Sequence, residues 1–147
     1  MAITRQAPNK VHLGGDVTLI NDVAAGEALT PGHLIDRYND SGTMKYRKHT
    51  GTSLAGSTFA NDQSMLNKGI TDAYASGDLV EAIIAHRGAS VYAFIASGQN
   101  IAQAAFLESA GNGTLKVYSS GVKIAQALES VNNSAGPSDA RIRVEVM

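Results

Sequence analysis

The chain has 147 residues, of which 12 are basic and 13 acidic, and this near-neutral balance gives no sign of a nucleic-acid surface. It contains no cysteine, which excludes disulfides, thiolate catalysis and cysteine-ligated metal sites. No stretch approaches the roughly 18 apolar residues of a membrane span, and the first residues lack the apolar core of a signal peptide. We therefore expect a soluble protein made in a cytosol, with neither nucleic acid nor membrane as a partner.

The length predicts one domain, large enough to bury about two thirds of the surface of the unfolded chain. The hydrophobic fraction of 44% is ordinary, but aromatic residues make up only 5% and Trp is absent. Many small and few large apolar side chains make a thin core. Backbone pairing and neighbouring subunits are therefore expected to supply part of the stability.

Residues 1–15 are predicted to form an extended N-terminal arm, because they begin with polar residues and Pro8-Asn9 is not typical of a packed element. Residues 17–20 then alternate as a strand does. Pro31-Gly32 predicts a tight turn, followed by a strand near residues 33–38. A second turn and a returning strand follow over residues 39–47, which completes the pattern of a β-hairpin.

The segment 49–64 is rich in Thr, Ser, Gly, Asn and Asp. It is predicted to be a long surface loop, where proteins often make contacts with partners. Beyond it, residues 79–85 and 91–96 are predicted to form two antiparallel strands joined by a turn.

Two Ala-rich segments, residues 101–110 and 124–131, leave two interpretations open. Their spacing fits a short helix, whereas comparison with other parts of the chain narrowly favours a strand. Residues 141–146 alternate strictly between charged and apolar side chains and predict a final strand.

A turn-and-strand pattern occurs twice in the chain. Residues 26–46 open with Gly-Glu-Ala-Leu and close with Gly-Thr-Met-Lys-Tyr, and residues 98–118 open with Gly-Gln-Asn-Ile and close with Gly-Thr-Leu-Lys-Val-Tyr. The second copy is followed only by residues 119–121 where the first is followed by 49–64, so that loop is predicted to be an insertion. The repeat predicts a mainly β fold over residues 16–147: a single compact β-barrel or β-tulip-like domain from two related halves, with at most short helices.

The sequence offers no constellation for catalysis, and we expect no catalytic, cofactor or metal site. The four histidines show no metal-ligand spacing; they are His12, His33, His49 and His86. Turns separate the nearest set of carboxylates, which is interpreted as structural; it consists of Asp72, Asp78 and Glu81.

A group of basic residues follows the predicted hairpin: Arg37, Lys45, Arg47 and Lys48. On alternating strand positions they could form a positive patch for phosphate or for an acidic partner. An ordinary solvated strand face is the favoured interpretation, because only Tyr38 and Tyr46 interleave with them.

The second part of the chain is a series of glycine turns and short strands: Gly77-Asp78-Leu79-Val80, Ser97-Gly98-Gln99-Asn100-Ile101, Leu107 to Lys116, Ile124 to Glu129 and Ala140 to Val144. This series resembles the small β-rich decoration proteins, or cement proteins, of tailed-bacteriophage capsids. The first copy of the repeat resembles the earlier half of the same family.

The resemblance implies a non-enzymatic protein on the outer surface of a phage head, synthesised in the host cytoplasm. Its partner would be the major capsid protein lattice, which such proteins bind and reinforce, commonly as homotrimers. In this family the N-terminal arm often contacts the capsid, so the arm residues Ile3, Arg5 and Lys10 are the predicted capsid-binding residues.

An alternative function from another class is a small β-barrel module of a virion tail or fibre that binds a ligand or carbohydrate. Sugar binding would favour a cluster of exposed aromatic side chains. The five Tyr and three Phe residues are instead spread along the chain.

Overall fold

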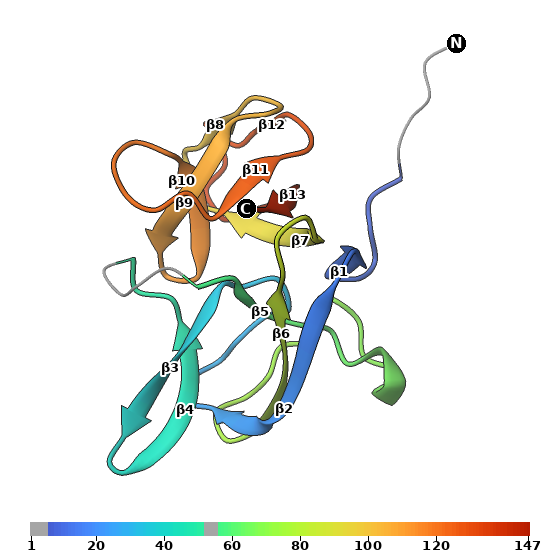
Figure 1. Cartoon of the computed structure of the whole chain (residues 1–147), viewed down its shortest axis with the longest axis vertical. Helices are drawn as coiled ribbons and strands as arrows, with labels where there is room; N and C mark the ends of the chain where they lie inside the picture. Colours follow the sequence, from blue (N-terminus) through green and yellow to red (C-terminus); the bar gives the residue numbers. More distant parts are fainter. Residues whose placement is uncertain (1–5, 52–55) are drawn as a thin grey trace.

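The computed structural model describes residues 6–51 and 56–147, and it confirms the prediction of a mainly β fold. Two halves built from strands are stacked along the long axis, with the first half below and the second above in Figure 1. Within the described ranges, the one helical element is the short 3-10 helix η1 (Ser64–Leu66). None of the helical structure described is long and apolar enough to cross a membrane.

The first half is built on a five-stranded sheet with the order β3-β4-β2-β6-β5. Its strands are β2 (Val17–Ala25), β3 (Ile35–Asp40), β4 (Thr43–Lys48), β5 (Thr58–Ala60) and β6 (Leu79–Ala85). β2 is antiparallel to β6, and its last residues run parallel to β4. Outside the named strands, Leu29 forms a bridge with Tyr74.

The second half holds a six-stranded sheet with the order β1-β7-β10-β9-β11-β13 and a two-stranded sheet, β12-β8. Its strands are β1 (His12–Gly14), β7 (Ser90–Ile95), β8 (Asn100–Ile101), β9 (Phe106–Gly111), β10 (Thr114–Val117), β11 (Ala125–Ala127), β12 (Val131–Asn132) and β13 (Ala140–Val146). β7 also pairs with β13, and β11 pairs with both β9 and β13, so the strands of this half close on one another.

Both halves use the same strand pairing. Each strand of the first-half sheet has a counterpart with equivalent partners in the second half: β7 corresponds to β2, β9 to β3, β10 to β4, β11 to β5 and β13 to β6. The Leu29–Tyr74 bridge corresponds to the pairing of Ile101 with Val131. The two related halves inferred from the sequence repeat are therefore two copies of one topology.

The two Ala-rich segments form strands, which settles the open choice between helix and strand. Residues 101–110 hold the end of β8 and most of β9, and residues 124–131 hold β11 and the start of β12. Ala125 and Ala127 are buried where β11 lies between β9 and β13. Pairing on both sides therefore outweighs the helix propensity of alanine.

The prediction of one long loop over residues 49–64 is wrong, because β5 lies inside it. Phe59 and Ala60 are fully buried, and β5 pairs with β6. The insertion in the first half instead spans residues 61–73, between β5 and Tyr74, where the second half has only residues 128–130 between β11 and β12. The segments before β5 (49–57) and before β11 (118–124) are of similar length.

The predicted arm is shorter than residues 1–15, because its last part belongs to the folded body. Residues 12–14 form β1, which pairs antiparallel with β7, and the side chain of Val11 is fully buried. Gly14-Gly15 allows this, since Gly15 adopts a φ of 82° and the chain can turn from β1 into β2. Of the described residues of the predicted arm, 6–11 precede the first strand.

One hydrophobic core joins the two halves. Leu34, Phe59 and Ile83 of the first half pack in the same cluster as Val91 and Ile142 of the second. A smaller cluster, which includes Leu29, fills the far end of the first half. Burying large apolar side chains contributes about 1.5–3 kcal/mol each, so the shared cluster couples the halves energetically.

Candidate interaction surface

The structure places one of the three predicted capsid-binding residues. Ile3 and Arg5 lie outside the described residues. Lys10 is exposed and lines a hollow of about 310 Å³. The other lining residues come mostly from the insertion and include Asp62, Asn67 and Lys68. The predicted arm and the unpredicted insertion therefore meet at one place on the surface.

A buried carboxylate holds the chain beside Lys10 in position. The backbone N–H of Val11 donates to Asp62 Oδ1 at 2.9 Å, and Asp62 is only 5% exposed. At the other end of this segment, Arg143 donates to the carbonyl oxygen of Gln6 at 2.5 Å and to Glu129 Oε2 at 2.6 Å. Two charge-assisted contacts thus fix residues 6–11 against the body.

The insertion presents large apolar side chains to solvent. Met65 is 91% exposed and Leu66 is 64% exposed, and both belong to η1. Leu79 of β6 is 59% exposed and lines a hollow of about 240 Å³ together with them. Asn67 ends η1 with a φ of 57°, which turns the chain sharply and leaves the two side chains at its apex.

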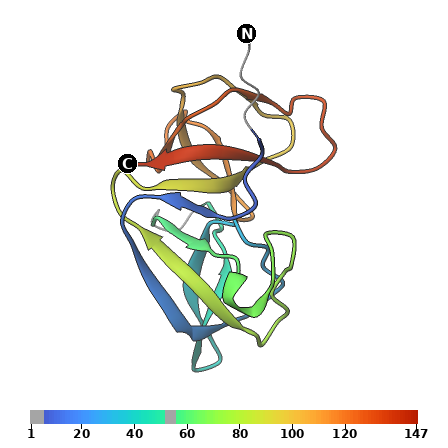
Figure 2. The same cartoon turned by 90° about the vertical axis from the view of Figure 1, so that its right-hand side faces the viewer.

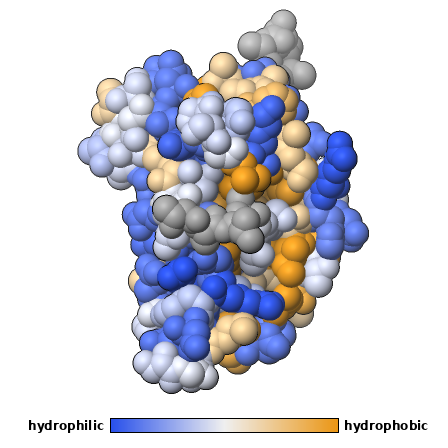
Figure 3. Space-filling model, turned by 60° about the vertical axis from the view of Figure 1, so that its left-hand side comes forward, coloured by the Kyte–Doolittle hydropathy of each residue, from blue (hydrophilic) through white to orange (hydrophobic). Residues whose placement is uncertain are grey.

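We call the surface formed by the following residues, together with the two hollows that they line, the insertion surface: Lys10, Met65, Leu66 and Leu79. Figure 3 shows a different face, with the left-hand side of Figure 1 turned forward and η1 turned away; on that face apolar side chains gather right of the centre and hydrophilic ones on the left. An apolar group rimmed by polar residues is typical of a contact surface. Covering one such leucine in a complex would contribute about 2 kcal/mol.

Ion pairs neutralise most of the basic group on the β3–β4 hairpin. Lys45 pairs with Asp40 at 2.8 Å, and Arg47 pairs with Asp36 at 3.1 Å. Lys48 also lies 4.0 Å from a carboxylate oxygen of Glu27. This agrees with the solvated strand face favoured from the sequence.

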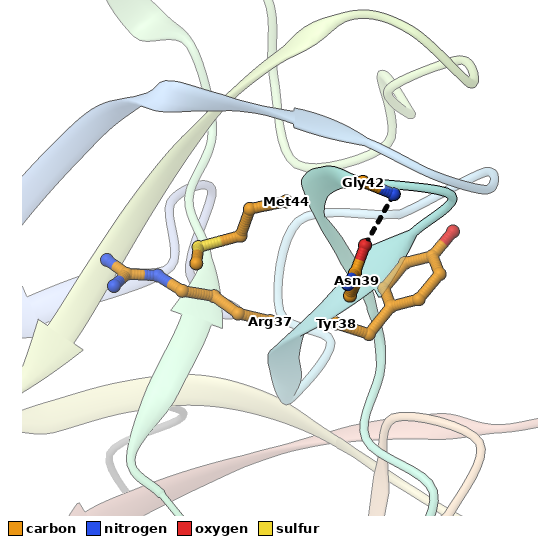
Figure 4. A pocket seen from close by; sticks show the side chains of 5 residues that line it. All are labelled: Arg37, Tyr38, Asn39, Gly42 and Met44. Atoms are coloured by element: carbon orange, nitrogen blue, oxygen red, sulfur yellow. Dashed lines mark hydrogen bonds between the residues drawn. The ribbon is translucent and has the colours of Figure 1, made fainter.

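Arg37 is the exception among the four basic residues, because the described residues offer it no carboxylate within ion-pair distance. It contacts the ring of Tyr46 and lines a hollow of about 330 Å³. In Figure 4 the side chains of Arg37 and Met44 extend to one side of the hairpin, away from Tyr38, while the backbone N–H of Gly42 donates to Asn39. None of the described residues that line this hollow is a carboxylate or an imidazole.

The histidines have structural roles. His33 is buried, accepts the Thr30 N–H at Nδ1, and has a pKa lowered to about 4 by burial and by Lys48 and Arg141. His49 is buried beside Ser109, at 2.8 Å, on the opposite half. His12 contacts the carbonyl oxygen of Gly15, and His86 contacts the hydroxyl of Thr18.

Two of the three carboxylates interpreted as structural stabilise turns, and the third, Glu81 of β6, accepts a hydrogen bond from Asn61 Nδ2 at 3.2 Å. Asp72 accepts the N–H of Gly69 at 2.7 Å, and Asp78 accepts the N–H of Ala75 at 2.9 Å. Within residues 6–51 and 56–147, no three His, Asp or Glu side chains are grouped so that they could hold a metal ion.

The sequence did not single out Met65, Leu66 and Leu79 as exposed apolar side chains. A signal was available: Met65-Leu66 is an apolar pair inside a polar stretch. Their exposure could not be read from the sequence, because it depends on the insertion projecting from the body.

Comparisons with known proteins support a likeness in fold. No protein-family model matches the chain, and no curated protein matches it. Among solved structures, the N base of the head fiber gp8.5 of bacteriophage phi29 is similar, with a TM-score of 0.57 and 11% sequence identity. The match covers 90% of this chain and 95% of that chain. The chain therefore shares, over nearly its whole length, the fold of the base of a phage head fiber.

Proposed function

We propose that this chain is a non-enzymatic structural accessory protein of a phage virion, which binds the outer surface of the assembled head and stabilises it. One observation carries the proposal: the fold likeness to the base of a head fiber extends over 90% of the chain. That protein is the base of a phage head fiber, and the decoration proteins that the sequence resembles are also head proteins.

The insertion surface supports a role in binding. It carries three apolar side chains that are each more than half exposed, which is costly in water unless a partner covers them. Lys10, predicted as a capsid contact, lies beside it. The major capsid protein is the proposed partner, and the insertion surface is the proposed contact.

A homotrimer is the proposed assembly. The thin core predicted from the composition fits a subunit that gains stability from its neighbours. Sedimentation equilibrium of the purified chain is expected to give three times the monomer mass, and a monomer at all concentrations would contradict the trimer.

Head binding can be tested with undecorated phage heads. The purified chain is expected to co-sediment with the heads and to raise the temperature at which they release DNA. Leu66→Asp should weaken binding at least tenfold, because it places a carboxylate where an apolar contact is proposed. Val122→Asp is the matched control, since Val122 is 57% exposed but lies in the second half.

The outcomes separate two claims. If the unmodified chain neither binds nor stabilises heads, the proposed function is wrong. If Leu66→Asp and Val122→Asp bind as well as the unmodified chain, head binding stands, but the insertion surface is not the contact.

A further inference from the structure

We infer that the outer edge of β2, over residues 17–21, is a docking site for an extended polypeptide strand of a partner protein. The occupant would add antiparallel to β2, with apolar side chains at its centre and a basic residue at each end. The inference rests on a difference between the two halves: β1 covers the edge of β7, whereas no described strand covers the equivalent edge of β2. It does not rest on head binding.

The edge of β2 carries unpaired backbone groups. The N–H of Ala85 donates to Ser57 and the carbonyl of Glu81 accepts from Asn61, so these residues of β6 face away from β2. The alternate residues of β6 therefore face β2, and they pair with Thr18 and Ile20. It follows from the strand alternation that the N–H and C=O groups of Val17 and Leu19 point to the opposite side. There, β2 has no strand partner among the described residues until Ala24 meets β4.

The second half shows what covers the equivalent edge. Ile20 pairs with Ala82 in the first half as Val91 pairs with Val144 in the second, so Leu19 and Ser90 are equivalent. At Ser90 and onward, β7 is covered by β1, which runs antiparallel to it. In Figure 2, β1 lies along β7, whereas the upper part of β2 forms the outer edge of its sheet.

The strand on β7 also shows how such an occupant binds. The N–H of Tyr92 donates to the carbonyl of Val11 at 2.8 Å, and the Val11 side chain is fully buried in the core. The register of β2 shifts between Ile20 and Val23, so Asn21 and Asp22 together have the position of Tyr92, and among the described residues no strand pairs with them on the free edge. An added strand would gain main-chain hydrogen bonds to β2 and place an apolar side chain beside Leu19, which is 52% exposed.

Charge selects the occupant. Asp16 and Asp22 are both exposed and flank the free edge. If two copies of the chain paired antiparallel through this edge about Leu19, Asp16 of each would lie opposite Asp22 of the other. Like charges directly opposite destabilise a strand pair. A second copy is therefore disfavoured, and a strand with a Lys or Arg at each end is favoured.

The test uses the full chain, labelled with nitrogen-15, and the probe peptide acetyl-Lys-Val-Thr-Val-Thr-Val-Lys-amide. Saturating peptide is expected to slow hydrogen exchange of the Leu19 amide at least tenfold and to shift the NMR signals of Leu19 and Asn21. A control peptide with Glu in place of both Lys residues should bind at least tenfold more weakly at low salt.

Two protein variants locate the site. Leu19→Pro removes the N–H that points to the free edge, where proline is tolerated, and should weaken peptide binding at least tenfold with the fold retained. If this variant does not fold, the double variant Asp16→Asn, Asp22→Asn serves instead, and it should lose the preference for the Lys peptide over the Glu peptide.

Three results would overturn the inference. One is no change in the Leu19 amide at millimolar peptide, and another is equal binding of the peptide by the unmodified chain and by Leu19→Pro. The third is a dimer in which the Leu19 amide is already protected without peptide, because that would make a second copy the occupant.

Discussion

The imidazole ring of His33 packs against the ring of Phe94, with 4.7 Å between their centroids, and this contact joins the first half to the second. His33 belongs to the segment before β3, whereas Phe94 belongs to β7. Burial, together with the positive charges of Lys48 and Arg141, lowers the pKa of His33 from 6.5 to about 4. The contact between the halves is therefore made by a neutral histidine.

Stability should fall in acid as His33 becomes protonated. Because the pKa is lower in the folded chain than in the unfolded chain, the unfolded chain binds more protons between pH 6.5 and about 4. The contribution of His33 is complete above pH 6.5 and is lost as the pH falls towards 4. Urea unfolding across this range should show a loss of up to about 3 kcal/mol.

A matched variant isolates this effect. His33→Gln removes the titrating group, so its unfolding free energy should change much less between pH 6.5 and 4.5. Glu108 titrates lower: burial opposes its ionisation, but hydrogen bonds from Gly121, Ser119 and Ser120 outweigh this and lower its pKa from 4.5 to about 2. An equally steep loss in His33→Gln above pH 4.5 would contradict the assignment to His33.

A pair of glycine substitutions tests how tightly the halves are joined. Gly42 and Gly113 end the β3–β4 and β9–β10 turns with φ values of 93° and 74°. A Cβ on Gly42 would meet nothing within 4 Å, whereas a Cβ on Gly113 would lie 3.2 Å from the His33 ring, the Leu34 carbonyl oxygen and the Lys48 side chain. Both alanine variants incur backbone strain of about 1–2 kcal/mol, but Gly113→Ala also pushes on the other half.

Gly113→Ala should therefore be the more destabilising variant, by at least about 1 kcal/mol in urea unfolding. The added methyl group would also displace the Gly113 carbonyl, which accepts a hydrogen bond from the Leu34 N–H across the halves at 2.9 Å. Equal stability of Gly42→Ala and Gly113→Ala would show that the junction yields to the added methyl group.

The same two turns show what the sequence could and could not predict. The repeated Gly-Thr-apolar-Lys pattern correctly indicated two related hairpins, because both turns need glycine at a positive φ. It aligned the strands incorrectly, since β4 and β10 differ in length. Aligned by their turns, the two hairpins would match Lys45 with Lys116. Aligned by their strand pairing, the ion pair of Arg47 with Asp36 matches the ion pair of Lys116 with Glu108.

Short elements were beyond sequence reasoning for a physical reason. β5 has three residues and β1 has three, too few for an alternation to stand out from a polar background. What makes them strands is the neighbour that each one meets, β6 for the first and β7 for the second. The longer segment 79–85 was predicted correctly because its run of apolar residues indicates a strand without reference to a neighbour.

Asp62 should be essential for holding the start of the chain on the body. Asp62→Ala would leave the buried N–H of Val11 without its partner, which costs about 1–3 kcal/mol. Asp62→Asn keeps an acceptor oxygen and should lose less. Urea unfolding measures the cost, and faster proteolytic cleavage near residue 10 in Asp62→Ala than in Asp62→Asn would show local release. Identical stability of both variants and the unmodified chain would contradict this role.

Two truncations should separate binding from folding in the N-terminal segment. Deleting residues 1–5 removes Ile3 and Arg5 but keeps the contact of Arg143 with Gln6, so stability should be nearly unchanged. Deleting residues 1–15 removes β1 and the fully buried Val11, and burial of valine alone contributes about 1.5–3 kcal/mol.

The longer deletion should therefore lower the unfolding free energy by several kcal/mol, whatever it does to head binding. The shorter deletion is the informative one for function, because a loss of head sedimentation with an unchanged urea midpoint would assign binding to Ile3 or Arg5. Full binding after the shorter deletion would leave Lys10 and the insertion surface as the proposed contact. A fully stable protein without residues 1–15 would contradict the role assigned to β1.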